Sequence, residues 1–283
     1  MSGLKEYASE SAQPAAPRRQ ILIGSGLGGL DLSKVPEVTA LFWIIKVLTT
    51  GMGEAASDFL AHTLGPIPAV GLSGLGLVAA LFFQFRVRRY VAGIYWTAVV
   101  MVSVFGTLAA DAAHVGFGVP YWASTLGFFA ALGVIFLVWQ RSEGTLSVHS
   151  IFTRRRETFY WATVLCTFAL GTAAGDWTAV TLGLGWLASG LLFAALIAVP
   201  AVLYRFGLNA VLAFWWAYVL TRPLGASFAD WVALPHSRGG LGAGTGVVTL
   251  AMSGVIVALV AFLAFSRQNI ESGATEAGTP GTR

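Results

Sequence analysis

The sequence has few charged residues and only one cysteine. Lys, Arg, Asp and Glu make up 11% of its 283 residues, whereas soluble domains contain about 25%. The single cysteine, Cys166, cannot form an intramolecular disulfide and lies in an apolar run, where we expect a small buried hydrophobic side chain. With 56% hydrophobic residues, the composition is typical of a polytopic membrane protein rather than a soluble domain.

The sequence also lacks the motifs that usually identify enzymes. It contains no nucleophile elbow, no Walker loop and no HExxH. The short loops cannot supply the soluble domain that an ATP-driven pump needs. We therefore predict that the protein is not an enzyme and has no cofactor. The basic residues are spread along the chain rather than gathered on one face, which argues against nucleic acid as a partner.

Apolar runs separated by polar breaks predict an all-α protein with eight transmembrane helices, since a spanning helix needs about 20 mostly apolar residues. We place these helices near residues 37–61, 67–85, 90–114, 119–139, 158–182, 184–204, 208–233 and 246–266. The polar composition of the first 35 residues is typical of a disordered tail. We therefore predict cytoplasmic disordered tails at 1–35 and 267–283, around a membrane domain at 36–266.

The distribution of Lys and Arg predicts the orientation of the chain. Of the 17 basic residues, fourteen fall in the two tails and in the loops on one side of the predicted bundle. The opposite loops hold only Arg238, and Lys46 and Arg222 lie inside predicted spans. By the positive-inside rule, both termini are expected in the cytoplasm. A bacterial cytoplasmic membrane fits this pattern.

A pattern of three residues recurs four times along the chain. A Trp preceded by Phe or Tyr is followed by Gly after ten residues, and the Gly is followed by Asp after five. The four sets are Trp43, Gly53 and Asp58; Trp96, Gly106 and Asp111; Trp161, Gly171 and Asp176; and Trp215, Gly225 and Asp230. They define repeats at about 37–86, 90–140, 157–205 and 208–266. Because each repeat contains two helices, the four repeats are parallel and form two pseudo-symmetric halves.

These four units resemble a known bacterial family. The segments "FWIIKVLTTGMGEAASDFL", "YWTAVVMVSVFGTLAADAA", "YWATVLCTFALGTAAGDWT" and "FWWAYVLTRPLGASFADWV" are similar to a membrane-protein repeat of two helices with a signature Trp, found as four tandem copies. The resemblance covers residues 37 to about 266. It implies the architecture, but the repeat has no known function, so the resemblance implies no activity.

The positions of the repeated residues suggest a role for each. The Trp lies near the cytoplasmic end of its helix, where indole rings favour the membrane interface, so we expect an anchor. The Gly is expected to let a neighbouring helix approach closely. The four Asp residues should lie at one depth in the outer half of the membrane. They are either structural residues or part of an ion site.

The first and fourth repeats carry additional charges inside the membrane, where charges are costly and commonly functional. Lys46, Thr50, Glu54 and Asp58 are spaced by four residues and therefore form one stripe on a helix. We predict that Lys46 pairs with Glu54 and that Arg222 binds a carboxylate, either Glu54 or an aspartate. The predicted substrate or ion-binding residues are Lys46, Thr50, Glu54, Asp58, Asp111, Asp176, Arg222 and Asp230.

Two histidines give a weaker indication of a metal site. His62 follows Asp58 by four residues, and His114 follows Asp111 by three. Carboxylate and imidazole ligands together suit Mn²⁺, Fe²⁺ or Zn²⁺. Both histidines are predicted at outer helix ends, however, where a histidine at the membrane interface is ordinary.

The residues support three hypotheses for function. The first is a secondary transporter of a cation or small solute, coupled to protons through the buried carboxylates. The second is a cation channel in which the aspartates form a selectivity ring. The third is a structural or sensory membrane protein whose polar residues hold helices together. The expected partners are the lipid bilayer and protons or cations, and a divalent cation is a possible cargo. An oligomer is compatible with each hypothesis.

Overall fold

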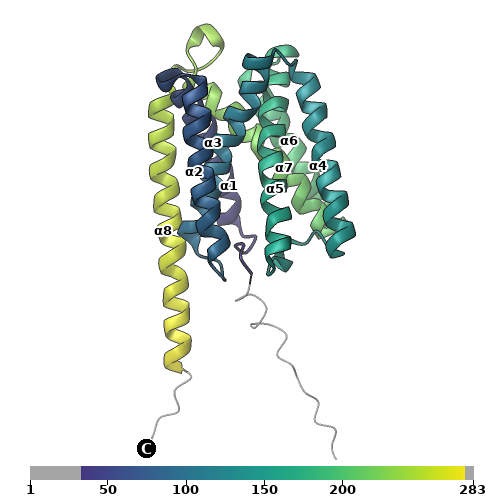
Figure 1. Cartoon of the computed structure of the whole chain (residues 1–283), viewed down its shortest axis with the longest axis vertical. Helices are drawn as coiled ribbons and strands as arrows, with labels where there is room; N and C mark the ends of the chain where they lie inside the picture. The colour runs from purple at the N-terminus through teal and green to yellow at the C-terminus, as the bar shows by residue number, and fades with distance from the viewer. Residues whose placement is uncertain (1–32, 278–283) are drawn as a thin grey trace, which may run out of the picture.

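The structure, a computed structural model, describes residues 33–277 and consists of helices arranged side by side (Figure 1). The predicted tail at 1–35 therefore lies outside the described residues, except for its last three positions. Eight α-helices are described, at Ala40–Leu64 (α1), Pro66–Arg86 (α2), Ala92–Asp111 (α3), Tyr121–Glu143 (α4), Arg154–Asp176 (α5), Trp186–Arg205 (α6), Ala210–Ala233 (α7) and Thr245–Ala277 (α8). Within residues 33–277 there is no strand, so the all-α prediction is confirmed.

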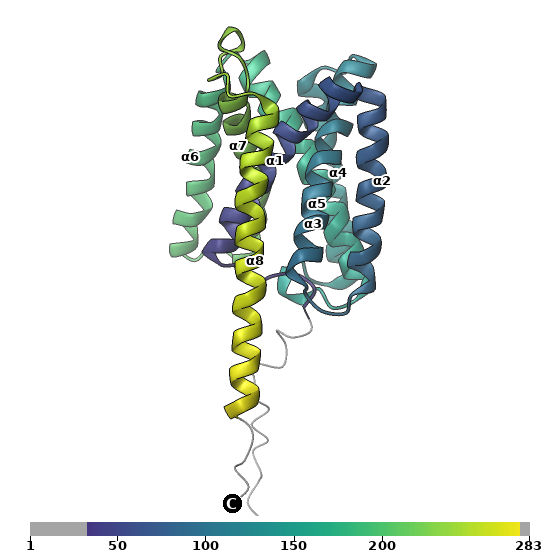
Figure 2. The same ribbon diagram turned by 90° about the vertical axis from the view of Figure 1, so that its left-hand side faces the viewer.

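Five helices are long and apolar enough by themselves to cross a membrane, namely α2, α3, α4, α6 and the Thr245–Ser266 part of α8. The helices α1, α5 and α7 are of similar length, with 25, 23 and 24 residues. They carry most of the polar residues discussed above and lie inside the bundle (Figures 1 and 2). Helix α8 continues as a helix to Ala277, beyond the predicted end of the membrane domain at 266.

The first helices of the four repeats form a ring. Helix α1 contacts α3, α3 contacts α5, α5 contacts α7, and α7 returns to α1. The second helix of each repeat then packs outside the ring, against the first helix of the next repeat. Thus α2 packs on α3, α4 on α5, α6 on α7, and α8 on α1. The four repeats therefore follow one another around an axis along the bundle, as expected for parallel repeats.

The repeated glycines lie where neighbouring ring helices meet. A Cβ atom on Gly53 would overlap Ser103, and a Cβ on Gly106 would overlap the base of Phe168. In the same way, Gly171 faces Arg222, and Gly225 faces Thr50. Each glycine thus accommodates the residue that stands seven positions after the Trp of the next repeat. The predicted close approach of helices is present at all four interfaces of the ring.

The repeated tryptophans are mostly buried, so the predicted anchoring at the membrane interface is wrong for three of them. Trp96, Trp161 and Trp215 have exposed fractions of only 2%, 3% and 4%. Trp161 packs against the ring of Tyr95, and Trp215 packs against the ring of Tyr160. The Trp215 indole N–H also donates to the Leu146 carbonyl at 2.9 Å. Trp43 is only half-buried. The sequence places these rings near one end of their helices but cannot tell whether they face lipid or the ring of helices.

The start of the described chain is fixed to the bundle rather than free. Lys34 forms a buried ion pair with Glu157 at the start of α5, and the Gln84 side chain donates to the same carboxylate at 3.0 Å. The Lys34 backbone N–H also donates to the Ile151 carbonyl. The predicted boundary at residue 35 is therefore too late, because residues 33–35 already belong to the folded part.

Candidate functional site

Arg222 on α7 is the one side chain that connects all four ring helices by hydrogen bonds among the described residues. Its guanidinium forms an ion pair with Glu54 of α1, with Nη2 and Oε2 2.6 Å apart. Nη2 also donates to the hydroxyls of Thr107 on α3 and Thr172 on α5, the latter at 2.7 Å, and Nη1 donates to the Thr50 carbonyl at 3.3 Å. The Arg222 side chain is fully buried. The prediction that Arg222 binds a carboxylate is confirmed, and Glu54 is that carboxylate.

The repeat explains why these groups meet. Glu54, Thr107, Thr172 and Ala226 all stand eleven residues after their Trp, and they form one layer across the ring. Arg222 belongs to the layer below, at position seven, together with Thr50, Ser103 and Phe168. Its guanidinium binds the three polar members of the layer above, and the missing side chain at Gly171 accommodates its stem. One arginine from the fourth repeat thus connects the layer that it belongs to with the layer above.

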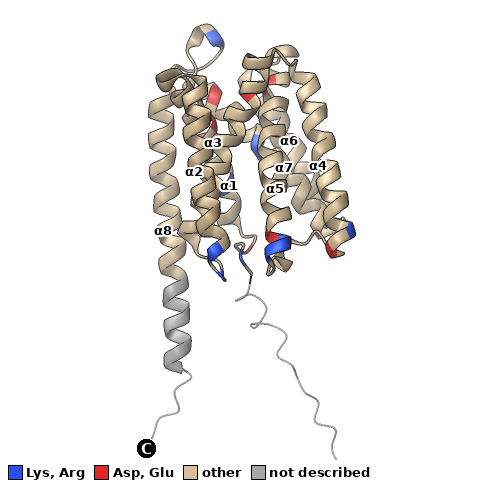
Figure 3. Ribbon diagram, viewed as in Figure 1, with Lys and Arg blue, Asp and Glu red and all other residues tan. Residues whose placement is uncertain are grey.

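Above Arg222, the carboxylates of the repeat come together. We call Glu54, Asp58, Asp111, Asp176 and Asp230 the acidic cluster. Oxygen atoms of Glu54, Asp58 and Asp111 lie within 4.8 Å of one another. Each of the four aspartates also interacts electrostatically with Glu54. We call the end of the bundle that holds Arg86, Arg141 and Arg205 the basic end, and the acidic cluster lies toward the opposite end (Figure 3).

The backbone beside the acidic cluster changes helix type in two repeats. Helix α3 ends at Asp111 and continues as a π-helical turn over Ala112–Gly116, and α5 continues after Asp176 in the same way over Trp177–Thr181. Helices α1 and α7 remain α-helical past their aspartates. A π-turn is rare and is frequently found at functional sites. The sequence contains no signal that predicts these turns.

Lys46 does not pair with Glu54, so this prediction is wrong. Its Nζ is buried and has no hydrogen-bond partner. Instead it lies over two aromatic rings, 4.2 Å from the centroid of Phe168 and 4.3 Å from that of Tyr218. The helix spacing correctly puts Lys46 and Glu54 on one face, but they stand two turns apart and Arg222 enters from α7 to bind Glu54. Cation–π contacts replace the expected ion pair.

The remaining predicted residues occupy distinct places. Thr50 contributes its carbonyl to Arg222, and its hydroxyl donates to the Thr221 carbonyl at 3.1 Å, which ties α1 to α7. His62 is exposed and contacts the backbone carbonyl of Asp58 rather than its carboxylate. His114 contacts the Val119 carbonyl at 2.9 Å. Among the described residues, Glu54, Asp58 and Asp111 form the group that could hold one ion, and neither histidine belongs to it.

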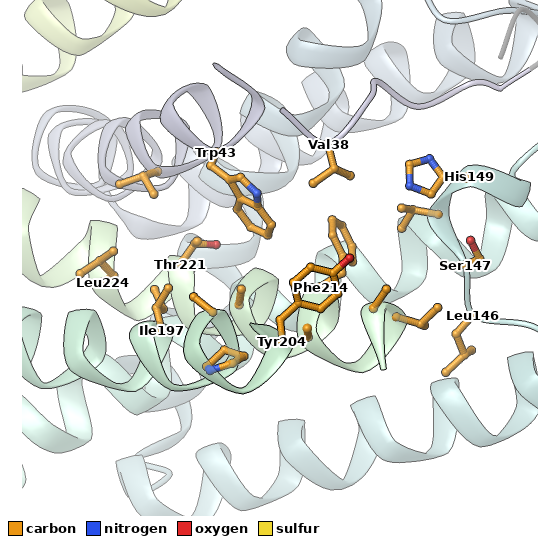
Figure 4. Close-up of a pocket in the computed structure, with 18 residues that line it drawn as sticks. Val38, Trp43, Leu146, Ser147, His149, Ile197, Tyr204, Phe214, Thr221 and Leu224 are labelled. Atoms are coloured by element: carbon orange, nitrogen blue, oxygen red, sulfur yellow. The ribbon is translucent and has the colours of Figure 1, made fainter. Parts of the chain in front are cut away.

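A separate cavity of about 640 Å³ lies in the basic half of the molecule (Figure 4). It is bounded by α1, α6, α7 and the segment that precedes α5. Trp43, Phe214, Tyr204 and Pro200 line it, with Ser147 and His149 as polar neighbours. No residue of the acidic cluster lines this cavity, and neither does Lys46 or Arg222. Its mostly apolar lining and its place between helices make it distinct from the site formed by Arg222 and the acidic cluster.

The comparison with protein families agrees with the repeat seen in the structure. A family model described as Repeat of Unknown Function (DUF347) matches four times, at residues 41–90, 94–145, 159–206 and 213–269. The chain belongs to the DUF347 repeat family. Each DUF347 match covers one ring helix and one outer helix. No curated protein and no solved structure matches the chain significantly.

The resemblance noted from the sequence is therefore confirmed, and the chain is a membrane protein with apolar helices that face the lipid bilayer. Several residues that the sequence analysis did not assign prove to be central. Thr107 and Thr172 contact Arg222, and the rings of Phe168 and Tyr218 lie under Lys46. Comparing equivalent positions of the four DUF347 repeats indicates them, because each stands in a layer with Lys46, Arg222 or Glu54.

Proposed function

We propose that the protein is a secondary transporter of a cation, coupled to protons, in the bacterial cytoplasmic membrane. The observation that carries the proposal is the acidic cluster on the axis of the ring, with Arg222 beneath it. Oxygen atoms of three carboxylates from α1 and α3 lie close enough to bind a single ion. Carboxylate oxygens are preferred ligands of hard divalent cations such as Mg²⁺, Ca²⁺ and Mn²⁺.

Protons and cations compete for the same groups in this proposal. Carboxylates crowded in a membrane repel one another when all are ionised. Binding of either a cation or protons relieves this repulsion. Arg222 neutralises Glu54 while the site is free of cargo. A cation that binds Glu54, Asp58 and Asp111 then competes with Arg222 for the Glu54 carboxylate. This competition links cargo binding to the four ring helices that Arg222 connects.

A channel with an aspartate ring is the second candidate, and the packing below the acidic cluster makes it less suitable. Arg222 and Phe168 occupy the axis directly beneath the carboxylates, and both are fully buried. An open channel needs a continuous path, whereas a transporter is closed on one side at a time. The proposed orientation, with both termini and the basic end in the cytoplasm, follows the positive-inside rule.

Binding of cations to the purified protein tests the proposal. We expect Mn²⁺ to raise the unfolding temperature in detergent, because a ligand that binds only the folded state stabilises it. Asp58→Asn should remove most of this stabilisation, since Asn keeps the shape but loses the charge. Glu37→Gln is the matched control, because Glu37 is an exposed carboxylate outside the cluster. Equal Mn²⁺ effects in wild type and Asp58→Asn would contradict a cation site here and favour a structural role.

A further inference from the structure

The basic half of the ring contains buried groups that can exchange protons but have no role in binding the cation. Lys46 has an exposed fraction of 1%, and Tyr95, Tyr160 and Tyr218 have fractions of 1%, 1% and 0%. All four lie on the axis side of the ring helices, between Arg222 and the basic end. A buried polar group normally requires a hydrogen-bond partner. Tyr95 and Tyr160 are hydrogen-bonded to each other, but Lys46 has no such partner and needs an explanation.

Lys46 is held without any hydrogen bond. Its Nζ lies over the rings of Phe168 and Tyr218, and the Arg222 guanidinium lies over the same Phe168 ring, 5.5 Å from its centroid. Glu54 is the next ionisable residue on α1, eight positions further along and about 12 Å away along the helix axis. An amine that no partner fixes is able to change its orientation. Lys46 thus stands between the Arg222–Glu54 pair and the aromatic residues below.

The tyrosines continue from Lys46 toward the basic end. The Tyr218 hydroxyl is buried and lies close enough to the Tyr160 hydroxyl to interact with it. The Tyr160 hydroxyl is hydrogen-bonded to that of Tyr95. The ring of Tyr95 contacts Tyr90, which is half-buried at the start of α3. Tyr218, Tyr160 and Tyr95 come from the adjacent ring helices α7, α5 and α3. Their hydroxyls therefore follow one another as a series across these helices.

The repeat argues that the hydroxyls are more than packing. Tyr95 and Tyr160 precede their Trp, and the equivalent residues of the other repeats are Phe42 and Phe214. All four rings fill the same layer of the bundle, and Phe42 is 3% exposed. Phenylalanine therefore suffices for packing in this layer. The two hydroxyls occur on the neighbouring helices α3 and α5, where they meet each other.

We propose that Lys46, Tyr218, Tyr160 and Tyr95 carry protons between Glu54 and the basic end, on a route that the cation does not share. The inference rests on the proposed transport function and adds a path for the coupled proton. The buried rings leave no passage for a cation in this conformation, whereas a proton moves by exchange between neighbouring groups. Each group binds one proton and releases one to the next, so one proton enters, one leaves, and no electron moves.

Other ionisable groups near this route are few. Tyr218 and Arg222 face it from α7 and Tyr95 from α3, while Tyr90 precedes α3. On α5, Glu157 stands one turn before Tyr160 and is paired with Lys34. Helix α8, which also packs on α1, has no ionisable residue between Thr245 and Ser266. Helix α2 has only Arg86, which is exposed at its end. Replacing Lys46 or a tyrosine therefore removes a member of the route, and the nearest other buried acid, Glu157, is already paired with Lys34.

The test compares cation exchange with proton movement in liposomes that contain the full-length protein. Exchange of radioactive Mn²⁺ at equal pH on both sides reports binding and alternating access, and a pH-sensitive dye inside the liposomes reports protons moved per Mn²⁺ transported. We expect Tyr160→Phe and Lys46→Met to retain Mn²⁺ exchange while the proton movement falls by about tenfold or more, as for a lost acid–base group. Tyr204→Phe is the matched control, because Tyr204 is exposed outside the ring.

Four outcomes are informative. Variants that exchange Mn²⁺ but move few protons support the route. Normal proton movement in both variants overturns it, and so does an equal loss of exchange and proton movement, which would indicate a packing role. Wild-type protein that neither exchanges Mn²⁺ nor moves protons overturns the transport function itself and this inference with it. Retained Mn²⁺ binding by the variants, measured from tryptophan fluorescence, distinguishes a folding defect from a lost route.

Discussion

At the scale of single residues, Arg222 sets the character of the site. It is the ion-pair partner of the buried Glu54, and from the fourth repeat it binds groups of the other three. A buried charge that loses its partner costs about 3–5 kcal/mol, whereas replacing both members of the pair by neutral side chains costs much less. Stability therefore requires either both members of the pair or the replacement of both.

We expect a double-mutant cycle to reveal this coupling. Arg222→Met and Glu54→Gln should each lower the free energy of unfolding in detergent by about 3 kcal/mol, and the double variant should lose less than the sum. The cycle of Lys46→Met and Glu54→Gln is the control, because these side chains do not contact each other. Additive losses for Arg222 and Glu54 would show that the observed contact contributes no interaction energy.

The four aspartates should not be equivalent. Additional charges inside the membrane occur only on the helices of Asp58 and Asp230, so the sequence alone favours these two for ion binding and Asp111 and Asp176 for stability. The structure instead groups Asp111 with Glu54 and Asp58. We therefore expect Asp58→Asn and Asp111→Asn to weaken Mn²⁺ binding by at least about tenfold, which equals about 1.4 kcal/mol. Asp176→Asn should weaken it less. Titration calorimetry measures the affinities, and the opposite order would favour the prediction from the sequence.

At the scale of helices, the ring depends on glycine at one position of every repeat. Gly106→Ala places a methyl group against the base of Phe168, and we expect a loss of about 1–3 kcal/mol of stability from overpacking. Gly175→Ala on α5 is the matched control, because its nearest neighbouring atom outside the helix backbone lies 3.8 Å from the new Cβ. Thermal unfolding in detergent compares the two. Equal stability of both variants would mean that the ring helices can separate without cost.

Helix positions were predictable from the sequence, but the arrangement of helices was not. Apolar runs predict all eight helices, because a helix in lipid must satisfy its own backbone, and only the end of α8 lies far from its predicted bound, at Ala277 rather than 266. The packing of α2 on α3, rather than mainly on its own repeat partner α1, depends on contacts between repeats. The partner of Lys46 was missed for the same reason, since spacing along one helix gives no information about Phe168 on α5 or Tyr218 on α7.

At the scale of the whole molecule, the charges are separated along the bundle axis. The acidic cluster lies toward one end, and the loops with most of the basic residues lie at the other. If the basic end faces the cytoplasm, Arg154→Cys should be protected from a membrane-impermeant thiol reagent in intact cells, and Ser237→Cys should be labelled. Both positions are exposed in the structure, and Cys166→Ser provides the background without a native thiol. The reverse labelling would invert the proposed orientation.

The central claim is that the acidic cluster transports a cation in exchange with, or together with, protons. Uptake of radioactive Mn²⁺ into liposomes containing the protein, driven only by a pH gradient, tests it most directly. We predict uptake that saturates with Mn²⁺ concentration, stops when a protonophore removes the gradient, and is lost in Asp58→Asn but retained in Glu37→Gln. Mn²⁺ uptake that is absent in wild type, or that is unchanged by the protonophore and by Asp58→Asn, would contradict the account.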